Sequence, residues 1–130
     1  MDTQMKRGFI EASVLACLSR DESYGYRIIR SVPPELELTE STLYPVLKRL
    51  EANGCVAVRA ADHNGRTRKY YRITAAGKAR LADFRAQRGQ VESVYDYIDG
   101  AAAADESSPE AASTTPFKNI SPRIQGVELA

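Results

Sequence analysis

The sequence predicts a mainly α-helical fold with one small β-hairpin. Three segments before Gly54 carry apolar residues at helical spacing. The segment from Cys55 to Thr74 instead alternates with a period of two around Asn64-Gly65, and a further helical segment follows it. A chain of 130 residues suits one domain with a modest core and a tail.

The first two helices are read from short amphipathic stretches. The stretch GFIEASVLACLSR places Ile10, Val14 and Leu18 on one helical face. The next stretch, ESYGYRIIRSV, offers Ser23 as the N-cap of a second helix. Pro33-Pro34 ends this helix, because a proline bars the residue before it from helical angles.

The third helix is expected from about Thr39 to Asn53, in and around the stretch STLYPVLKRLEANG, with Gly54 as a left-handed exit. On a helical wheel one face is wholly aliphatic and holds Leu43, Val46, Leu47 and Leu50. The opposite face is slim, polar and basic and holds Ser41, Tyr44, Pro45 and Lys48.

Pro45 leaves two starting points open for this helix. With Thr42 as the N-cap, the missing N–H of Pro45 has no helical partner to lose. With a start at Thr39, the proline removes one hydrogen bond and bends the first turn.

The stretch CVAVRAADHNGRTRKYYRIT predicts a hairpin, because Asn64-Gly65 suits the positive φ angles of a type I′ turn. Thr74 then caps a helix expected over residues 75–99. Its apolar seam has 3-4-3-4-3 spacing, is interrupted at Arg88 and Gly89, and predicts a dimer interface formed by Leu81, Phe84, Arg88, Val91, Tyr95 and Ile98. Residues 100–130 are rich in Ala, Ser, Pro and Thr and are predicted to be a disordered tail.

This order of elements predicts a winged helix-turn-helix domain over residues 1–74, followed by a long C-terminal dimerisation helix. The positive charge supports a polyanion partner. The whole chain carries a net charge of +1, but seven basic residues face two acidic ones between Ser41 and Ile73. No apolar run suits a membrane span or a signal peptide, so we expect a cytoplasmic protein. Cys17 and Cys55 are then expected as free thiols, with a redox pair as the open alternative.

The polar face of the third helix suits the major groove of double-stranded DNA, and the basic hairpin tip suits phosphates or a narrow minor groove. The predicted DNA-contacting residues are Ser41, Thr42, Tyr44, Pro45, Lys48, Arg66, Arg68 and Lys69. The alternative is a winged-helix interaction module that binds an acidic protein. The sequence holds no nucleophile–base pair, no phosphate-cradling glycine loop and no metal-ligand cluster around its single histidine, His63, so we expect no enzyme, cofactor or metal.

Three stretches, SYGYRII, STLYPVLKRLEANG and GRTRKYYRITAAGKARL, resemble successive motifs of the PadR family of bacterial transcriptional regulators. The resemblance covers about residues 5–99. It implies a homodimer on a dyad-symmetric operator, usually a repressor loosened by a small-molecule effector. It also implies that Tyr24 approaches the DNA backbone.

We expect Phe9, Phe84 and Tyr95 to belong to the core of the dimer, with an effector pocket at the interface as the alternative. Members of the family commonly carry a tryptophan in the C-terminal helix, whereas this chain has none. Stacking of an effector on tryptophan is therefore not expected here.

Overall fold

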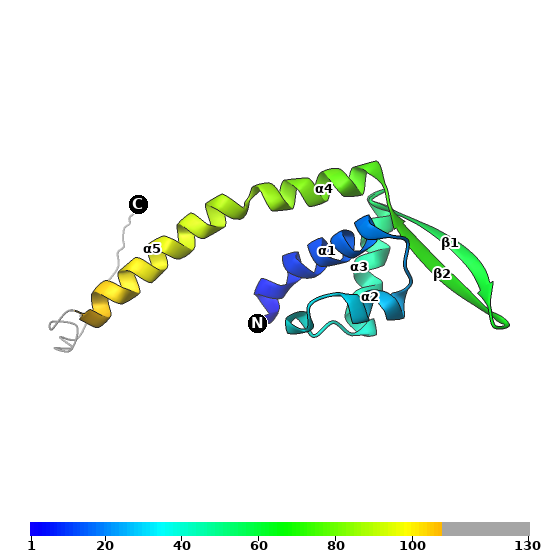
Figure 1. Cartoon of the computed structure of the whole chain (residues 1–130), viewed down its shortest axis with the longest axis horizontal. Helices are drawn as coiled ribbons and strands as arrows, with labels where there is room; N and C mark the ends of the chain where they lie inside the picture. The colour runs from blue at the N-terminus through cyan, green and yellow to red at the C-terminus, as the bar shows by residue number, and fades with distance from the viewer. Residues whose placement is uncertain (108–130) are drawn as a thin grey trace. The chain divides into compact units, whose positions relative to one another are not determined.

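The computed structural model describes residues 1–107 of the chain. Its elements follow one another as α1 (Thr3–Arg20), α2 (Gly25–Ser31), a 3-10 turn η1 (Pro34–Leu36), α3 (Glu40–Ala52), β1 (Val56–His63), β2 (Arg66–Ile73), α4 (Ala75–Ala86) and α5 (Arg88–Ser107) (Figure 1). The chain divides into two compact units, Met1–Arg88 and the part from Gly89 onward. The winged helix-turn-helix fold predicted from the sequence is thus confirmed.

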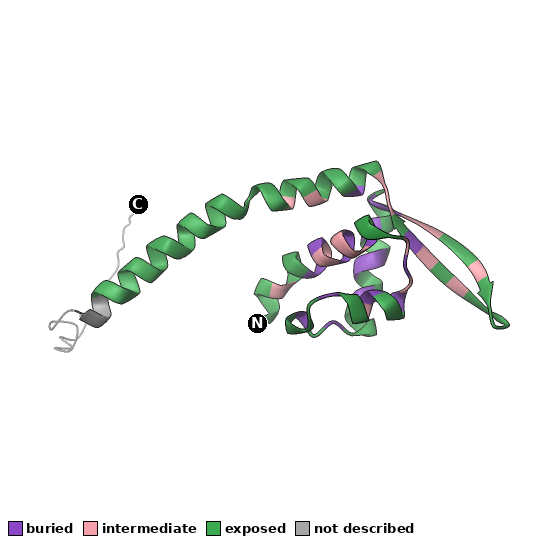
Figure 2. Ribbon diagram, in the orientation of Figure 1, coloured by how far each residue is buried: buried purple, intermediate pink, exposed green. Residues whose placement is uncertain are grey.

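The core of the first unit lies where α1, α2 and α3 meet (Figure 2). Val14, Ile28, Leu43 and Leu50 are completely buried there. The predicted aliphatic face of α3 is confirmed, since its four members are all buried and the residues of the opposite face are exposed. One side of α3 is therefore committed to the core, and the other is presented to solvent.

The prediction that Ser23 is the N-cap of α2 is wrong, because α2 begins at Gly25 and Tyr24 occupies the cap position. The backbone of Ser23 is committed elsewhere. Its N–H donates to the Tyr71 carbonyl at 3.0 Å, and its carbonyl accepts from the Tyr71 N–H at 2.7 Å. This isolated bridge ties the start of α2 to the second strand of the hairpin.

The helix α3 begins earlier than one of the two predicted starting points. Its N-cap is Thr39, so the alternative start at Thr42 is wrong. Pro45 consequently lies inside the helix, and its missing N–H leaves the Ser41 carbonyl without its usual helical donor. The helix ends at Ala52, and its C-cap Asn53 is followed, as predicted, by Gly54 with a left-handed φ of +74°.

The hairpin also follows the prediction. The strands β1 and β2 pair in antiparallel register from Val56 opposite Ile73 to His63 opposite Arg66. Asn64 and Gly65 link them with φ angles of +52° and +78°, as a type I′ turn requires. We call this hairpin, Val56–Ile73, the wing.

The predicted cap of the next helix is confirmed. The Thr74 hydroxyl accepts from the Gly77 N–H at 3.1 Å and donates to the Gly54 carbonyl at 2.6 Å. The helix itself packs on α1, where the rings of Phe9 and Phe84 meet edge to face with centroids 5.6 Å apart. The helix α4 is therefore part of the first compact unit.

The expected single helix over residues 75–99 is divided in two. The first part ends at Ala86, where the Gln87 N–H turns back to the Phe84 carbonyl, and Gly89 follows as a weak helix former. The second part, α5, continues beyond Gly100 to Ser107, so the prediction of disorder is wrong for residues 100–107. The run of alanines after Gly100 explains the difference, since alanine has the highest helix propensity and extends a helix that already exists. The rest of the predicted tail, residues 108–130, lies outside the described residues.

Candidate nucleic-acid interface

A hollow of about 690 Å³ lies between the start of α2, the start of α3 and the wing. Its lining comes from Tyr24, Gly25, Tyr26, Glu40, Tyr44, His63, Arg66, Thr67, Arg68, Lys69 and Tyr71. The buried Tyr71 forms part of its wall, and burial raises the pKa of this phenol above its ordinary value.

The structure brings most of the predicted DNA-contacting residues to this surface. Five of them line the hollow: Tyr24, Tyr44, Arg66, Arg68 and Lys69. The other four are exposed on α3 outside the hollow: Ser41, Thr42, Pro45 and Lys48.

Sequence reasoning did not assign five polar residues of the lining to the site: Tyr26, Glu40, His63, Thr67 and Tyr71. Tyr26 is 58% exposed and stacks with Arg30, whose guanidinium carbon lies 5.6 Å from the ring centroid. Glu40 is the first residue of α3. The position of Glu40 directly before the basic face of α3 could have identified it as part of the site.

Tyr44 is held against the first turn of α2 by the absence of a side chain at Gly25. A methyl group added at Gly25 would overlap the hydroxyl oxygen of Tyr44 and press on its ring. The tyrosine nevertheless remains 44% exposed. The glycine of the stretch SYGYRII therefore sets the position of the aromatic side chain that α3 presents to solvent.

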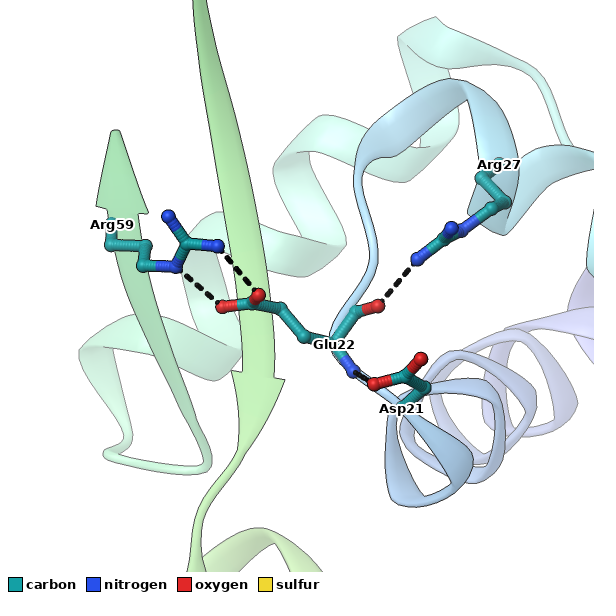
Figure 3. A network of polar contacts seen from close by, with 4 residues as sticks. All are labelled: Asp21, Glu22, Arg27 and Arg59. Carbon is teal, nitrogen blue, oxygen red and sulfur yellow. Dashed lines mark hydrogen bonds and ion pairs between the residues drawn. The ribbon is translucent and has the colours of Figure 1, made fainter. Parts of the chain in front are cut away.

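One arginine of the wing is neutralised within the protein. The Glu22 carboxylate accepts from Arg59 Nε and Nη2 at 2.7 Å each (Figure 3). This pair lowers the pKa of Glu22 and raises that of Arg59. The Glu22 backbone carbonyl also accepts from Arg27 Nη2 at 2.6 Å, so Glu22 joins the start of α2 to β1.

The other cations near the hollow have no such partner. Among the side chains of residues 1–104, no carboxylate lies within 4.0 Å of Lys48, Arg49, Arg66, Arg68 or Lys69. Unpaired cations beside a hollow favour an anionic ligand, because the ligand can neutralise them at no cost in existing ion pairs.

Arg68 is held by aromatic rings. Its guanidinium carbon lies 3.9 Å from the centroid of the Tyr24 ring, and Nη1 donates to the Tyr70 hydroxyl at 3.4 Å. The rings of Tyr24 and Tyr70 meet edge to face at 5.7 Å, and Arg59 lies over Tyr70 at 4.7 Å. The start of α2 and both strands of the wing thus meet in one alternating cluster of rings and guanidiniums.

The predicted dimer residues fall into two groups. Leu81 and Phe84 are half-buried on α4 within the first unit. Val91, Tyr95 and Ile98 are 46%, 47% and 52% exposed on α5, which Arg88 begins.

The three predicted effector residues are divided in the same way. Phe9 and Phe84 contact each other in the first unit, whereas Tyr95 belongs to the second. A hollow of about 180 Å³ lies beside Phe84, between α1 and α4.

The side chains that the structure describes, those of residues 1–104, include no group of three or more metal-ligating residues that could hold an ion. Across residues 1–107, every helix is too short or too polar to span a lipid bilayer. Cys17 is half-buried and Cys55 buried, and both are free thiols.

The order of elements and the hairpin define a winged helix-turn-helix protein. The model of the family described as "Transcriptional regulator PadR-like family" matches residues 14–83, and the chain belongs to this family. The resemblance inferred from the three sequence stretches is thereby confirmed.

Relatives agree with this assignment. "Uncharacterized protein X" of Lysinibacillus sphaericus is 32% identical over 95 residues, which cover 69% of this chain and 87% of that protein. The structure of a transcriptional regulator from Clostridium thermocellum is 26% identical, with a TM-score of 0.66 over 72% of this chain and 96% of that one. A PadR-like transcriptional regulator from Bacillus cereus is 28% identical, with a TM-score of 0.62 over 73% and 95% of the two chains.

Proposed function

We propose that the chain is a homodimeric, sequence-specific transcriptional repressor that works in the cytoplasm. It binds a dyad-symmetric operator and is released by a small-molecule effector. The observation that carries the proposal is the exposed polar face of α3 beside a hollow whose cations have no carboxylate partner among the side chains of residues 1–104.

In this proposal α3 enters the major groove with its first turns toward the base edges. Ser41, Thr42, Tyr44 and Pro45 are exposed on those turns, and Lys48 follows one turn later. Hydroxyl groups there exchange hydrogen bonds with base edges or phosphates, and the proline ring packs against a thymine methyl group.

The wing supplies the contacts to the DNA backbone. Arg66 and Lys69 are exposed beside the turn, and Arg68 lies between them in the sequence. Contacts from such side chains to phosphates give affinity and fix the orientation of the protein, but they carry little sequence information. The bases are therefore read by α3, and the wing holds the domain in place.

Exposed apolar side chains support the dimer. Val91, Tyr95 and Ile98 recur on α5 at the spacing of a helical seam, and Met5 and Phe9 of α1 are 46% and 43% exposed. A second copy of the chain would cover such faces in a self-complementary interface with two-fold symmetry. Two α3 helices related by that axis require an operator with matching half-sites.

The candidate effector site is the hollow beside Phe84, between α1 and α4. The hollow beside Phe84 measures about 180 Å³. Ligand pockets commonly measure ~300–1,000 Å³. We therefore place the effector where a second copy would enlarge this hollow, next to the Phe9–Phe84 contact.

The test is an anisotropy titration of the full chain against DNA from upstream of its own gene, with a scrambled duplex of equal length as the control. Each titration is run at two salt concentrations. The slope of the logarithm of the binding constant against the logarithm of the salt concentration becomes more negative by about 0.9 for every phosphate neutralised. Light scattering measures the mass of the free protein and of the complex.

Preferential, salt-sensitive binding of two chains per duplex would support the proposal. Equal binding to both duplexes would mean that this DNA lacks the operator, and a pool of random duplexes would then be selected for the preferred sequence. Failure to enrich any sequence, or absence of binding by a folded dimer, would overturn the proposal and favour an acidic protein partner.

A further inference from the structure

We infer that Tyr24 is a positioning residue, which acts on DNA through Arg68 rather than by a contact of its own. Its ring forms the platform on which the Arg68 guanidinium rests, so that the remaining N–H groups of the arginine face the phosphate. This inference rests on the proposed DNA-binding function and assigns a role within it.

The geometry of the stack carries the inference. The Arg68 guanidinium carbon lies 3.9 Å from the Tyr24 centroid, which is the shortest of the cation–ring distances among the described residues. A guanidinium over a tyrosine ring is attracted by the negative face of the ring. Stacking occupies the flat face of the guanidinium and leaves the N–H groups at its edge free to donate.

The other contacts of Arg68 are with Tyr70. Its side chain donates to the Tyr70 hydroxyl at 3.4 Å and lies 5.9 Å from the centroid of that ring, and it makes no ion pair with the side chains of residues 1–104. Arg27 also lies over the Tyr24 ring, at 5.1 Å, but is fixed independently by the Ser23 hydroxyl at 3.0 Å and the Glu22 carbonyl at 2.6 Å. Loss of the Tyr24 ring therefore releases Arg68 and leaves Arg27 in place.

Contacts with β2 hold the Tyr24 ring in place. Tyr24 follows Ser23, whose backbone is bonded twice to Tyr71 of β2. Its ring also meets the Tyr70 ring edge to face at 5.7 Å. A flexible arginine on an exposed wing loses side-chain entropy when it binds a phosphate, and a stack formed in the free protein reduces that loss.

The first experiment compares Tyr24→Phe, which keeps the ring and removes the hydroxyl, with Tyr24→Leu, which removes the ring. Binding is measured to the duplex that the wild-type protein prefers, at several salt concentrations. We expect Tyr24→Phe to bind within about twofold of the wild type. We expect Tyr24→Leu to lose about two- to tenfold in affinity, the size of a cation–π contact. Its salt slope should become shallower by about 0.9, which corresponds to one phosphate. Tyr97→Leu on α5 is the matched control, since Tyr97 is 79% exposed and makes no ring contact among the described residues.

The second experiment is a double-mutant cycle with Arg68→Ala. If Tyr24 acts through Arg68, adding Tyr24→Leu to Arg68→Ala weakens binding no further. Fully additive losses would overturn the inference. So would an equal loss from Tyr24→Phe and Tyr24→Leu, because the hydroxyl would then contact DNA directly.

A third measurement needs no DNA. The side-chain protons of Arg68 should be shifted upfield in the NMR spectrum by the ring current of Tyr24, and Tyr24→Leu should abolish this shift while Tyr24→Phe retains it. Absence of the shift in the wild type overturns the stack, whether or not DNA binds. If the upfield shift is present but the protein binds no DNA, the stack stands and the proposed function is contradicted. Thermal unfolding of each variant verifies that it is folded.

Discussion

Glu22 accepts two hydrogen bonds from Arg59, each 2.7 Å long, across 37 positions of the sequence. The pair joins the segment before α2 to β1 of the wing, and it removes one arginine from the charge available to a ligand. The four cations of the wing that have no carboxylate within 4.0 Å among the described side chains are consequently all on β2: Arg66, Arg68, Lys69 and Arg72. We therefore expect DNA to contact the wing along one strand.

The ion pair gives a prediction for acid stability. Hydrogen bonding to Arg59 lowers the pKa of Glu22 below its ordinary 4.5 in the folded protein. The unfolded chain therefore takes up this proton first, so the stability from Glu22 is complete above about pH 4.5 and is lost as the pH falls through the folded pKa.

Thermal unfolding of the wild type and Glu22→Gln between pH 3 and pH 7 measures this contribution. We expect the wild type to have the higher midpoint at neutral pH and the difference to shrink in acid. The pair of Glu37 with Lys6 titrates in the same direction and is common to both proteins, so it cancels in the comparison. A difference that stays constant with pH would contradict the prediction.

Gly25→Ala should weaken DNA binding and leave the free energy of unfolding nearly unchanged. The new methyl group overlaps the Tyr44 hydroxyl, but this is the far end of a half-exposed side chain, which can rotate toward solvent. Alanine also gains up to about 1 kcal/mol of helix propensity over glycine. We expect a free energy of unfolding within about 1 kcal/mol of the wild type, because the gain offsets the displacement.

DNA affinity should nevertheless fall as far as in Tyr44→Ala, because the aromatic side chain has left its position. The loss should be larger for the preferred duplex than for scrambled DNA, since Tyr44 is proposed to read bases. Gly89→Ala is the matched control, because nothing lies within 4 Å of its added methyl group. Unchanged affinity in Gly25→Ala would show that the position of Tyr44 does not matter for binding.

Glu40→Gln should strengthen binding to DNA of any sequence. Glu40 is the one carboxylate among the described residues that line the hollow, and it repels phosphate. Removing one exposed like charge corresponds to about a two- to fivefold gain, given ~1 kcal/mol for two charges 4 Å apart in water. The preferred duplex should gain less if the carboxylate also accepts from a cytosine amino group there. Titration beside Glu35→Gln, an exposed glutamate outside the hollow, measures the effect, and equal affinities would contradict it.

Ile98→Glu should dissociate the proposed dimer. The side chain is 52% exposed on α5, in line with Val91 and Tyr95, and a charge buried between two copies has no partner there. Light scattering should report a shift from two chains to one, accompanied by a large loss of DNA affinity. Tyr97→Glu is the control, because that residue lies off the seam. A variant that stays dimeric would place the interface elsewhere.

Local patterns predicted the parts of the fold that local forces determine. The spacing of four aliphatic residues gave the buried face of α3, and Asn64-Gly65 gave the turn of the wing. Ser23 failed as an N-cap because its backbone pairs with Tyr71, a tertiary contact that outweighs a local capping preference. The prediction of disorder failed for residues 100–107, because the alanine run has a high helix propensity and extends α5.

Part of the candidate site could likewise be predicted from the sequence, and part could not. Exposed side chains of α3 and the charge of the wing tip could be identified from periodicity and composition. The stack of Arg68 on Tyr24 could not, because it depends on how the start of α2 meets β2. The fit of Tyr44 against Gly25 likewise depends on the crossing of α2 and α3. These contacts join residues far apart in the sequence, and no periodicity encodes them.

The proline within α3 has a consequence for the stiffness of that helix. Because Pro45 has no N–H, the Ser41 carbonyl is an acceptor without its usual helical partner on the exposed side of α3. The Pro45 ring stands where that donor would be, so the first turns of α3 are joined to the rest of the helix by one main-chain hydrogen bond fewer. A substitution of Ser41 or Thr42 changes a side chain and leaves this missing bond as it is. The part of α3 that carries the exposed polar face therefore bends more easily than the rest of the helix, whichever side chains stand on it.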